Sequence, residues 1–144
     1  MSVSQNDLLS QAKQLLLTAS TELDFRNVIG RAYYAAYHEA TRFHDSLPTR
    51  GKDPSKTLGM HAELAFRLQS PTIPQSDPRF YKSQNIGRHL GWLHEKRVKA
   101  DYRLRQTLAK SESEEVVARA ARLFELCSEA IDAGKRATPK APPV

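Results

Sequence analysis

Apolar residues recur every three or four positions along most of this chain, and that spacing predicts helices rather than strands. The pattern is strongest in the segment that opens at Thr21 and continues through Phe43, where no proline interrupts it and Gly30 is the only glycine. No alternation of apolar and polar residues is long enough to predict a strand. The chain is therefore expected to be all-α.

Further helices are expected on both sides of this segment. An apolar stripe that ends near Ser20 predicts a first helix, and two later stripes predict a third helix at about 57–68 and a fourth at about 79–101, separated by a proline-rich stretch. Hydroxyl and acidic residues from Ser111 open a fifth helix, which Gly134 ends. The sequence predicts an up-and-down antiparallel bundle of four to five helices in one domain at 1–134. A disordered, basic and proline-rich tail is expected at 135–144.

The composition of the chain limits which binding partners, which bonded or metal sites and which cellular location are expected. The net charge of +6 over 144 residues favours an anionic partner such as RNA, DNA or an acidic protein. The single cysteine, Cys127, excludes an internal disulfide, and no histidine or carboxylate spacing suggests a metal or cofactor site. No apolar stretch is long enough to span a membrane and no leader opens the chain, so we expect a cytoplasmic protein without membrane contact.

The segment 31–38 combines an arginine, three tyrosines and a histidine with three alanines. Arg31 and His38 are seven positions apart, which places them on one helix face roughly 10 Å apart along the axis, with Tyr34 between them. A cation, a proton-transferring imidazole and a stacking ring together suit RNA chemistry. The alternative is structural: the tyrosines pack between helices, while Arg31 and His38 pair with carboxylates.

The segment 82–110 is strongly basic and carries several rings. Its cations outnumber Glu95 and Asp101, and they are Lys82, Arg88, Lys96, Arg97, Lys99, Arg103, Arg105 and Lys110. Basic residues beside stackable rings are typical of single-stranded RNA binding. The alternative is a solvated basic helix whose Trp92 belongs to the core.

Within this segment Arg88 precedes His94 by six residues. Such a pair would place a general acid or base beside a cation that stabilises a pentacovalent phosphate, which would allow metal-independent RNA cleavage by the 2′-hydroxyl. His61, on the apolar face of the third helix, is interpreted instead as a core histidine.

Two short elements resemble the HEPN-domain family. They are Arg-Ala-Tyr-Tyr-Ala-Ala-Tyr at 31–37 and Arg-Val-Lys-Ala-Asp-Tyr at 97–102, with His61 on a helix between them, and the resemblance covers about residues 5–134. It implies a helical bundle that dimerises through a two-fold face. It also implies a function in RNA cleavage, nucleotide binding, defence or toxin-antitoxin systems, where many relatives pair with a small nucleotidyltransferase.

Catalytic members of that family use an arginine followed four to six residues later by a histidine, and two alignments compete in this chain. Arg88 with His94 satisfies the pattern, whereas Arg97 with Tyr102 replaces the histidine by tyrosine. The carry-over makes Arg88, His94, Arg97 and Tyr102 the candidate catalytic residues. Tyr33 and Asp101 are taken as structural motif residues. The expected RNA contacts come from the basic segment and from the 31–38 face, and they are Lys96, Lys99, Arg103, Arg31, Tyr34 and His38.

The sequence therefore leads to a homodimeric, RNA-directed toxin or defence ribonuclease as its first hypothesis. A non-catalytic module that binds a nucleotide, RNA or a partner protein in the same basic groove is the alternative. A third interpretation is a helical assembly component whose tyrosines form the dimer interface.

Overall fold

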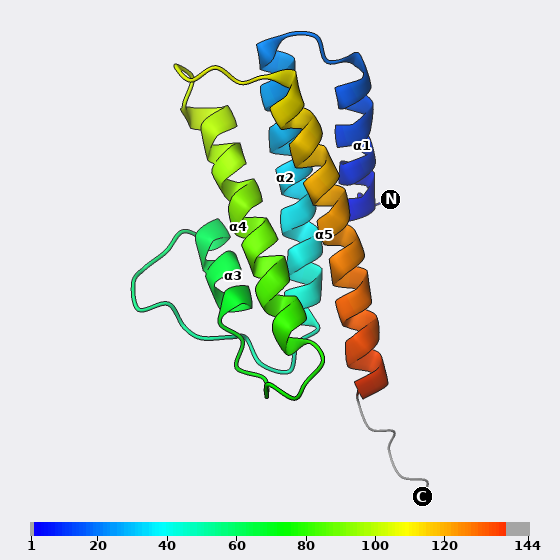
Figure 1. Ribbon diagram of the computed structural model, residues 1–144, viewed down its shortest axis with the longest axis vertical. Helices are drawn as coiled ribbons and strands as arrows, with labels where there is room; N and C mark the ends of the chain where they lie inside the picture. The colour runs from blue at the N-terminus through cyan, green and yellow to red at the C-terminus, as the bar shows by residue number, and fades with distance from the viewer. Residues whose placement is uncertain (1, 138–144) are drawn as a thin grey trace, which may run out of the picture.

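The computed structural model of the protein describes residues 2–137, and within that range the regular structure is entirely helical (Figure 1). The helices are α1 (Gln5–Thr18), α2 (Glu22–Asp45), α3 (Met60–Gln69), α4 (Phe80–Tyr102) and α5 (Lys110–Ala137). None of the helices in this part of the chain is both long and apolar enough to cross a membrane. The all-α prediction is confirmed.

The first two helices begin with the same reciprocal cap. The Ser4 hydroxyl accepts a hydrogen bond from the backbone N–H of Asp7, and the Asp7 carboxylate accepts one from the Ser4 N–H. Thr21 and Asp24 repeat the arrangement at the start of α2. Each cap satisfies N–H groups that have no partner inside the helix, and so it fixes where the helix begins.

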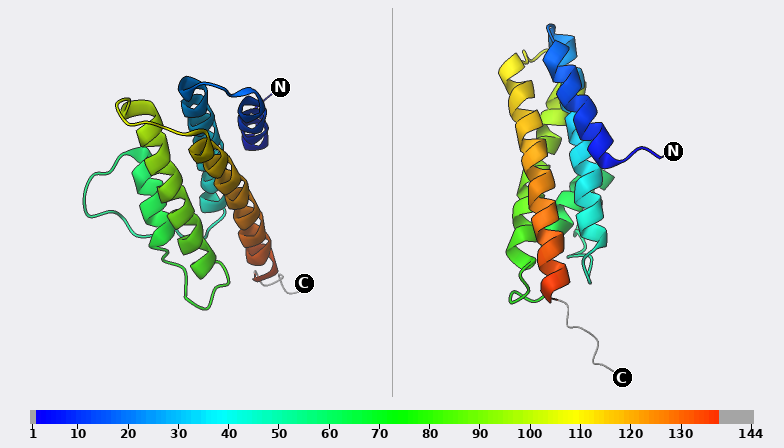
Figure 2. Two further views of the ribbon diagram at one scale, coloured as in Figure 1. Left: turned by 45° about the horizontal axis from the view of Figure 1, so that its top comes forward. Right: turned by 90° about the vertical axis from the view of Figure 1, so that its right-hand side faces the viewer.

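The four long helices alternate in direction, whereas α3 does not. The connection 46–59 arcs away from the bundle and returns along it, so that α3 runs the same way as α2 and antiparallel to α4 (Figures 1 and 2). With 10 residues against the 23 of α4, α3 covers only part of its neighbour. The predicted up-and-down order is thus correct for α1, α2, α4 and α5, and the long connection explains the exception.

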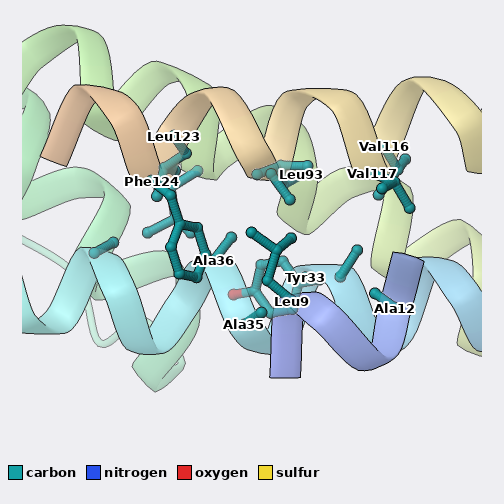
Figure 3. Close-up of a cluster of buried hydrophobic side chains, with 14 of the residues drawn as sticks. Leu9, Ala12, Tyr33, Ala35, Ala36, Leu93, Val116, Val117, Leu123 and Phe124 are labelled. Atoms are coloured by element: carbon teal, nitrogen blue, oxygen red, sulfur yellow. The ribbon is translucent and has the colours of Figure 1, made fainter. Parts of the chain in front are cut away.

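The core lies between α2, α4 and α5, and α1 closes one side of it (Figure 3). The side of α2 that faces these helices is built from small residues that are fully buried, namely Ala32, Ala35, Ala36 and Ala40. Small side chains let neighbouring helices approach closely, and larger residues on the facing helices fill the space. Two large polar residues are also buried on this part of α2, namely Tyr33 at 1 % and Glu39 at 2 % exposure.

A buried arginine ties the end of α4 to the beginning of α2. The Arg26 guanidinium donates hydrogen bonds to the backbone carbonyls of Lys99 (3.0 Å), Ala100 (2.9 Å) and Gln106 (2.6 Å). It also pairs with Glu22 at 3.0 Å, whose carboxylate accepts the Leu108 N–H at 2.8 Å. Carbonyls at a helix C-terminus lack partners inside the helix and attract a cation, so Arg26 both caps α4 and anchors the following loop.

The last helix extends beyond its predicted end. Gly134 lies inside α5, which continues to Ala137, so residues 135–137 of the predicted tail are helical. The remainder of that tail, 138–144, lies outside the described residues.

Arg26→Ala is expected to lower the free energy of unfolding by about 3 kcal/mol, because several carbonyls and the Glu22 carboxylate would lose a buried charged donor. Urea unfolding followed by circular dichroism measures the change. Lys13→Ala on the exposed side of α1 is the control and is expected to change stability by less than about 0.5 kcal/mol. Equal stability of the two variants would show that Arg26 does not anchor α4.

Candidate functional site

Four aromatic side chains meet where α2, α3 and α4 come together. Tyr33 and Tyr37 come from α2, His61 from the first turn of α3 and His94 from α4, and we call them the ring cluster. The two imidazoles stack at 5.8 Å between centroids with their planes 17° apart. The Tyr33 ring lies 5.4 Å from His61 and 5.6 Å from His94, and the Tyr37 ring lies 4.5 Å from His61.

A hydrogen bond of 2.8 Å between the Tyr33 hydroxyl and His61 Nδ1 orients one of these imidazoles. A phenol can donate this bond to a neutral imidazole or accept it from a protonated one, so the contact survives a change in charge on His61. Burial raises the pKa of Tyr33, which keeps the phenol protonated at neutral pH. Tyr33 is therefore a positioning residue.

Arg97 supplies the positive charge of the site. Its guanidinium lies 5.8 Å from the centroids of both Tyr33 and Tyr102, and its Nε donates to Asp101 Oδ2 at 2.9 Å. Burial, and secondly the charge of Arg97, lower the pKa values of His61 and His94 below the usual 6.5. Both imidazoles are therefore neutral at pH 7 and able to accept a proton.

An open groove of about 720 Å³ adjoins the ring cluster, between α1, α2 and the end of α4. It is lined by Gln11, Leu15, Arg26, Asn27, Gly30, Arg31, Tyr33, Tyr34, Arg97 and Asp101, and we call it the Arg31–Arg97 groove. Within the described residues Arg31 forms no hydrogen bond or ion pair, so its guanidinium is available to a ligand. Three arginines line the groove; the guanidinium of Arg26 is engaged by backbone carbonyls and Glu22, and those of Arg31 and Arg97 suit an anion.

A second hollow lies on the other side of His94. It occupies about 490 Å³ between α3 and α4, and its lining includes Phe66, Gly91 and His94. Arg97, one helical turn after His94, lines the Arg31–Arg97 groove instead. His94 lines this hollow, and its ring lies 5.6 Å from that of Tyr33, which lines the Arg31–Arg97 groove.

The structure brings many of the predicted site residues together. Arg97, Asp101 and Tyr102 follow His94 along α4, and Tyr33 joins them from α2. Arg31 and Tyr34 line the same groove, as their predicted common face requires, and the Tyr34 ring contacts His38 edge-on at 4.5 Å.

Other predicted residues lie elsewhere on α4. Lys99 donates to both carboxylate oxygens of Glu112 on α5, and Lys96 lies 3.8 Å from the same carboxylate.

Arg88 is exposed, and its charge acts on His89 rather than on His94. Six positions along an α-helix differ by about 120° around the axis, so Arg88 and His94 point in different directions. No hydrogen bond, ion pair or ring contact joins the two among the described residues, and the pair stays a prediction. Arg103 is exposed at the C-terminal cap of α4.

Two residues of the site region were not predicted to belong to it. His61 was interpreted as a core histidine, whereas it is half-buried and bonded to Tyr33 and so belongs to the ring cluster. Arg26 was not singled out, although it stands seven residues before Tyr33 and therefore on the same buried face of α2. The sequence did contain a signal for Arg26, because it places a cation among the apolar residues on the buried face of α2. The partner of His61 lies on another helix, so the spacing of residues near His61 could not predict the contact.

Over residues 2–137 no group of three or more His, Cys, Asp or Glu side chains is arranged to hold a metal ion. The chain matches no protein-family model, and comparison with curated proteins and with solved structures finds no match. The function is therefore argued from the site itself.

The free energy of unfolding is expected to fall as pH drops from about 7.5 toward about 5.5. His61, His89 and His94 have pKa values below 6.5 in the folded protein, so the unfolded chain binds more protons in this range. Carboxylates do not contribute, because their ordinary pKa values of 3.8 and 4.5 are lower. Urea unfolding at a series of pH values measures the slope.

Replacing these three histidines by glutamine is expected to flatten the slope, whatever its effect on stability at pH 7.5. An unchanged slope in the triple variant would show that the folded protein does not hold the histidines neutral.

Proposed function

We propose that the protein is a HEPN-type endoribonuclease that cleaves RNA without a metal ion at the ring cluster and the Arg31–Arg97 groove. The observation that carries the proposal is the stacking of His61 on His94 at 5.8 Å beside Arg97. Two imidazoles that exchange protons near neutral pH and one fixed cation are the groups that this reaction needs.

In the proposed reaction the ribose 2′-oxygen attacks the adjacent phosphorus and the bond from phosphorus to the 5′-oxygen breaks, which leaves a 2′,3′-cyclic phosphate and a 5′-hydroxyl. His94, whose ring lies 5.6 Å from that of Tyr33 at the wall of the Arg31–Arg97 groove, takes the proton of the 2′-hydroxyl. A bound phosphate raises the pKa of His61, so that its imidazolium delivers a proton to the leaving 5′-oxygen. Arg97 stabilises the charge that develops on phosphorus.

Several features favour RNA as the substrate. The net charge of +6 attracts a polyanion, and Arg31 has no partner among the described residues. Tyr34, which lines the groove, and Tyr102, next to Arg97, are 46 % and 68 % exposed, so each ring offers surface on which a base can stack. The resemblance of the 31–37 and 97–102 elements to HEPN proteins supports the same substrate, and it supports a homodimer that acts in defence or as a toxin beside a nucleotidyltransferase antitoxin.

One observation favours the alternative, a module that binds a nucleotide or RNA without turnover. Asp101 already bonds Arg97 at 2.9 Å and also lines the groove, so part of the positive charge is neutralised before any ligand arrives. In that function the same groove holds a phosphate, and the imidazoles serve to pack α3 against α2 and α4.

The deciding experiment incubates the purified protein with total RNA and with tRNA in EDTA. Discrete cleavage by the wild type is expected, with a rate at least about 100-fold lower for His94→Ala and for Arg97→Ala because each removes a group that acts in the transition state. His44→Ala, remote from the ring cluster, is the control and is expected to cleave at the wild-type rate. Circular dichroism checks that every variant is folded.

The outcomes separate the candidates. RNA that stays intact while binding the protein would contradict cleavage and favour the binding module. Cleavage that survives both His94→Ala and His61→Ala would exclude the ring cluster as its site. A loss at saturating RNA in Arg88→Ala equal to that of His94→Ala would favour the pair predicted from the sequence.

A further inference from the structure

The side of α4 that faces α5 carries a basic cluster that the proposed reaction does not use. It is centred on the chain's single tryptophan and consists of Arg88, His89, Trp92, Lys96, Arg119 and Arg122, and we call it the Trp92 patch. Arg88 and Arg97 are nine positions apart on α4, which places them on opposite sides of the helix. The patch is therefore separate from the ring cluster.

Trp92 orders two of the cations. The Arg119 guanidinium lies 4.2 Å from the centroid of the indole, and Lys96 Nζ lies 5.2 Å from it. A guanidinium stacked on a ring keeps its N–H edges directed outward, where they can bind a further group. The Glu115 carboxylate is 3.9 Å from Arg119, beyond hydrogen-bond distance, so those donors are not used up.

Three guanidiniums also gather around His89. Burial lowers the pKa of His89, and the charges of Arg119, Arg122 and Arg88 lower it further. Its Nδ1 is buried and has no hydrogen-bond partner among the described residues. Arg122 bonds Glu125 at 2.8 Å, whereas Arg88 has neither a hydrogen bond nor an ion pair within the described residues. Glu112 lies 3.8 Å from Lys96 and Glu129 lies 4.0 Å from Arg122, both beyond hydrogen-bond distance, so these carboxylates leave donors of the patch open to a further anion.

The cluster is also extended. Arg88 and Lys96 are eight positions apart on one helix, which corresponds to about 12 Å along the axis. A single phosphate cannot span that distance, whereas a polymer with repeated charges can. Three of the four permanent cations are arginines, whose planar fork matches two oxygens of one phosphate. These features favour a phosphodiester chain over isolated anions.

We propose that the Trp92 patch binds the phosphate backbone of a single RNA strand, as a second contact remote from the ring cluster. The identity of the polymer rests on the proposed function, whereas the existence of the anion site rests on the patch alone. A strand that reaches both surfaces has to pass around α4, whose diameter with side chains is about 10–12 Å. A dinucleotide therefore engages only one surface at a time.

The test measures the anisotropy of a fluorescein-labelled 2′-O-methyl oligouridine of about twelve nucleotides, titrated with protein between about 50 and 200 mM salt. This probe has no free 2′-hydroxyl, so it resists the proposed reaction and reports binding whether or not the protein cleaves RNA. The patch variant is Arg88→Gln with Arg119→Gln, and the control is Lys13→Gln with Arg50→Gln, which removes the same charge from exposed positions elsewhere.

The patch variant is expected to bind at least about tenfold more weakly, and the slope of log affinity against log salt is expected to fall by about 1.4, since each lost single-strand phosphate contact removes about 0.7. The control is expected to keep the wild-type slope. Arg88→Gln alone removes an exposed side chain without an intramolecular hydrogen bond, so it tests the patch without threatening the fold, and about half of the slope change is expected.

Equal slopes for the patch variant and the control would overturn the proposal. Displacement of the probe by polyglutamate as effectively as by unlabelled oligouridine, per charge, would also overturn it and would assign the patch to an acidic protein. A labelled 2′-O-methyl dinucleotide is expected to lose affinity with Arg97→Gln and not with Arg88→Gln. The reverse result would place the nucleotide site in the patch and contradict the separation of the two surfaces.

Discussion

The fold depends on α2, which packs against all four other helices. Its alanines bring α4 and α5 close, and the same close packing encloses Tyr33, whose hydroxyl must then find a partner inside the protein. His61 provides that partner and draws the start of α3 against α2 and α4. Arg26, seven residues earlier, holds the end of α4 at the same helix. The packing of one helix thus determines where the histidines of the site lie.

The two opposite sides of α4 carry different kinds of side chain. One side carries His94, Arg97 and Asp101 toward the ring cluster and its groove, while the side toward α5 carries Trp92 and the cations around it. On the first side the charges are few and next to imidazoles, which suits proton transfer at one phosphate. On the second they are spread along the helix, which suits holding a chain.

The sequence predicted the helices well because apolar spacing and end signals are local properties, as the caps at Ser4 and Thr21 show. It also predicted that Arg31 and Tyr34 share a face. The pair Arg88 and His94 stays a prediction, because six positions along an α-helix differ by about 120° around the axis and no contact among the described residues joins the two side chains. The hydrogen bond between His61 and Tyr33 could not be predicted, because the two residues are 28 positions apart and only packing brings them together.

The measurement that tests the central claim most directly is nuclear magnetic resonance of the histidine rings during titration with a 2′-O-methyl uridine dinucleotide. If a phosphodiester binds beside Arg97, the ring signals of His61 and His94 move and their pKa values rise, because an anion favours the imidazolium. The signal of His44, remote from both surfaces, stays fixed. Unmoved signals of His61 and His94 at saturating dinucleotide, or movement confined to His89, would contradict the account.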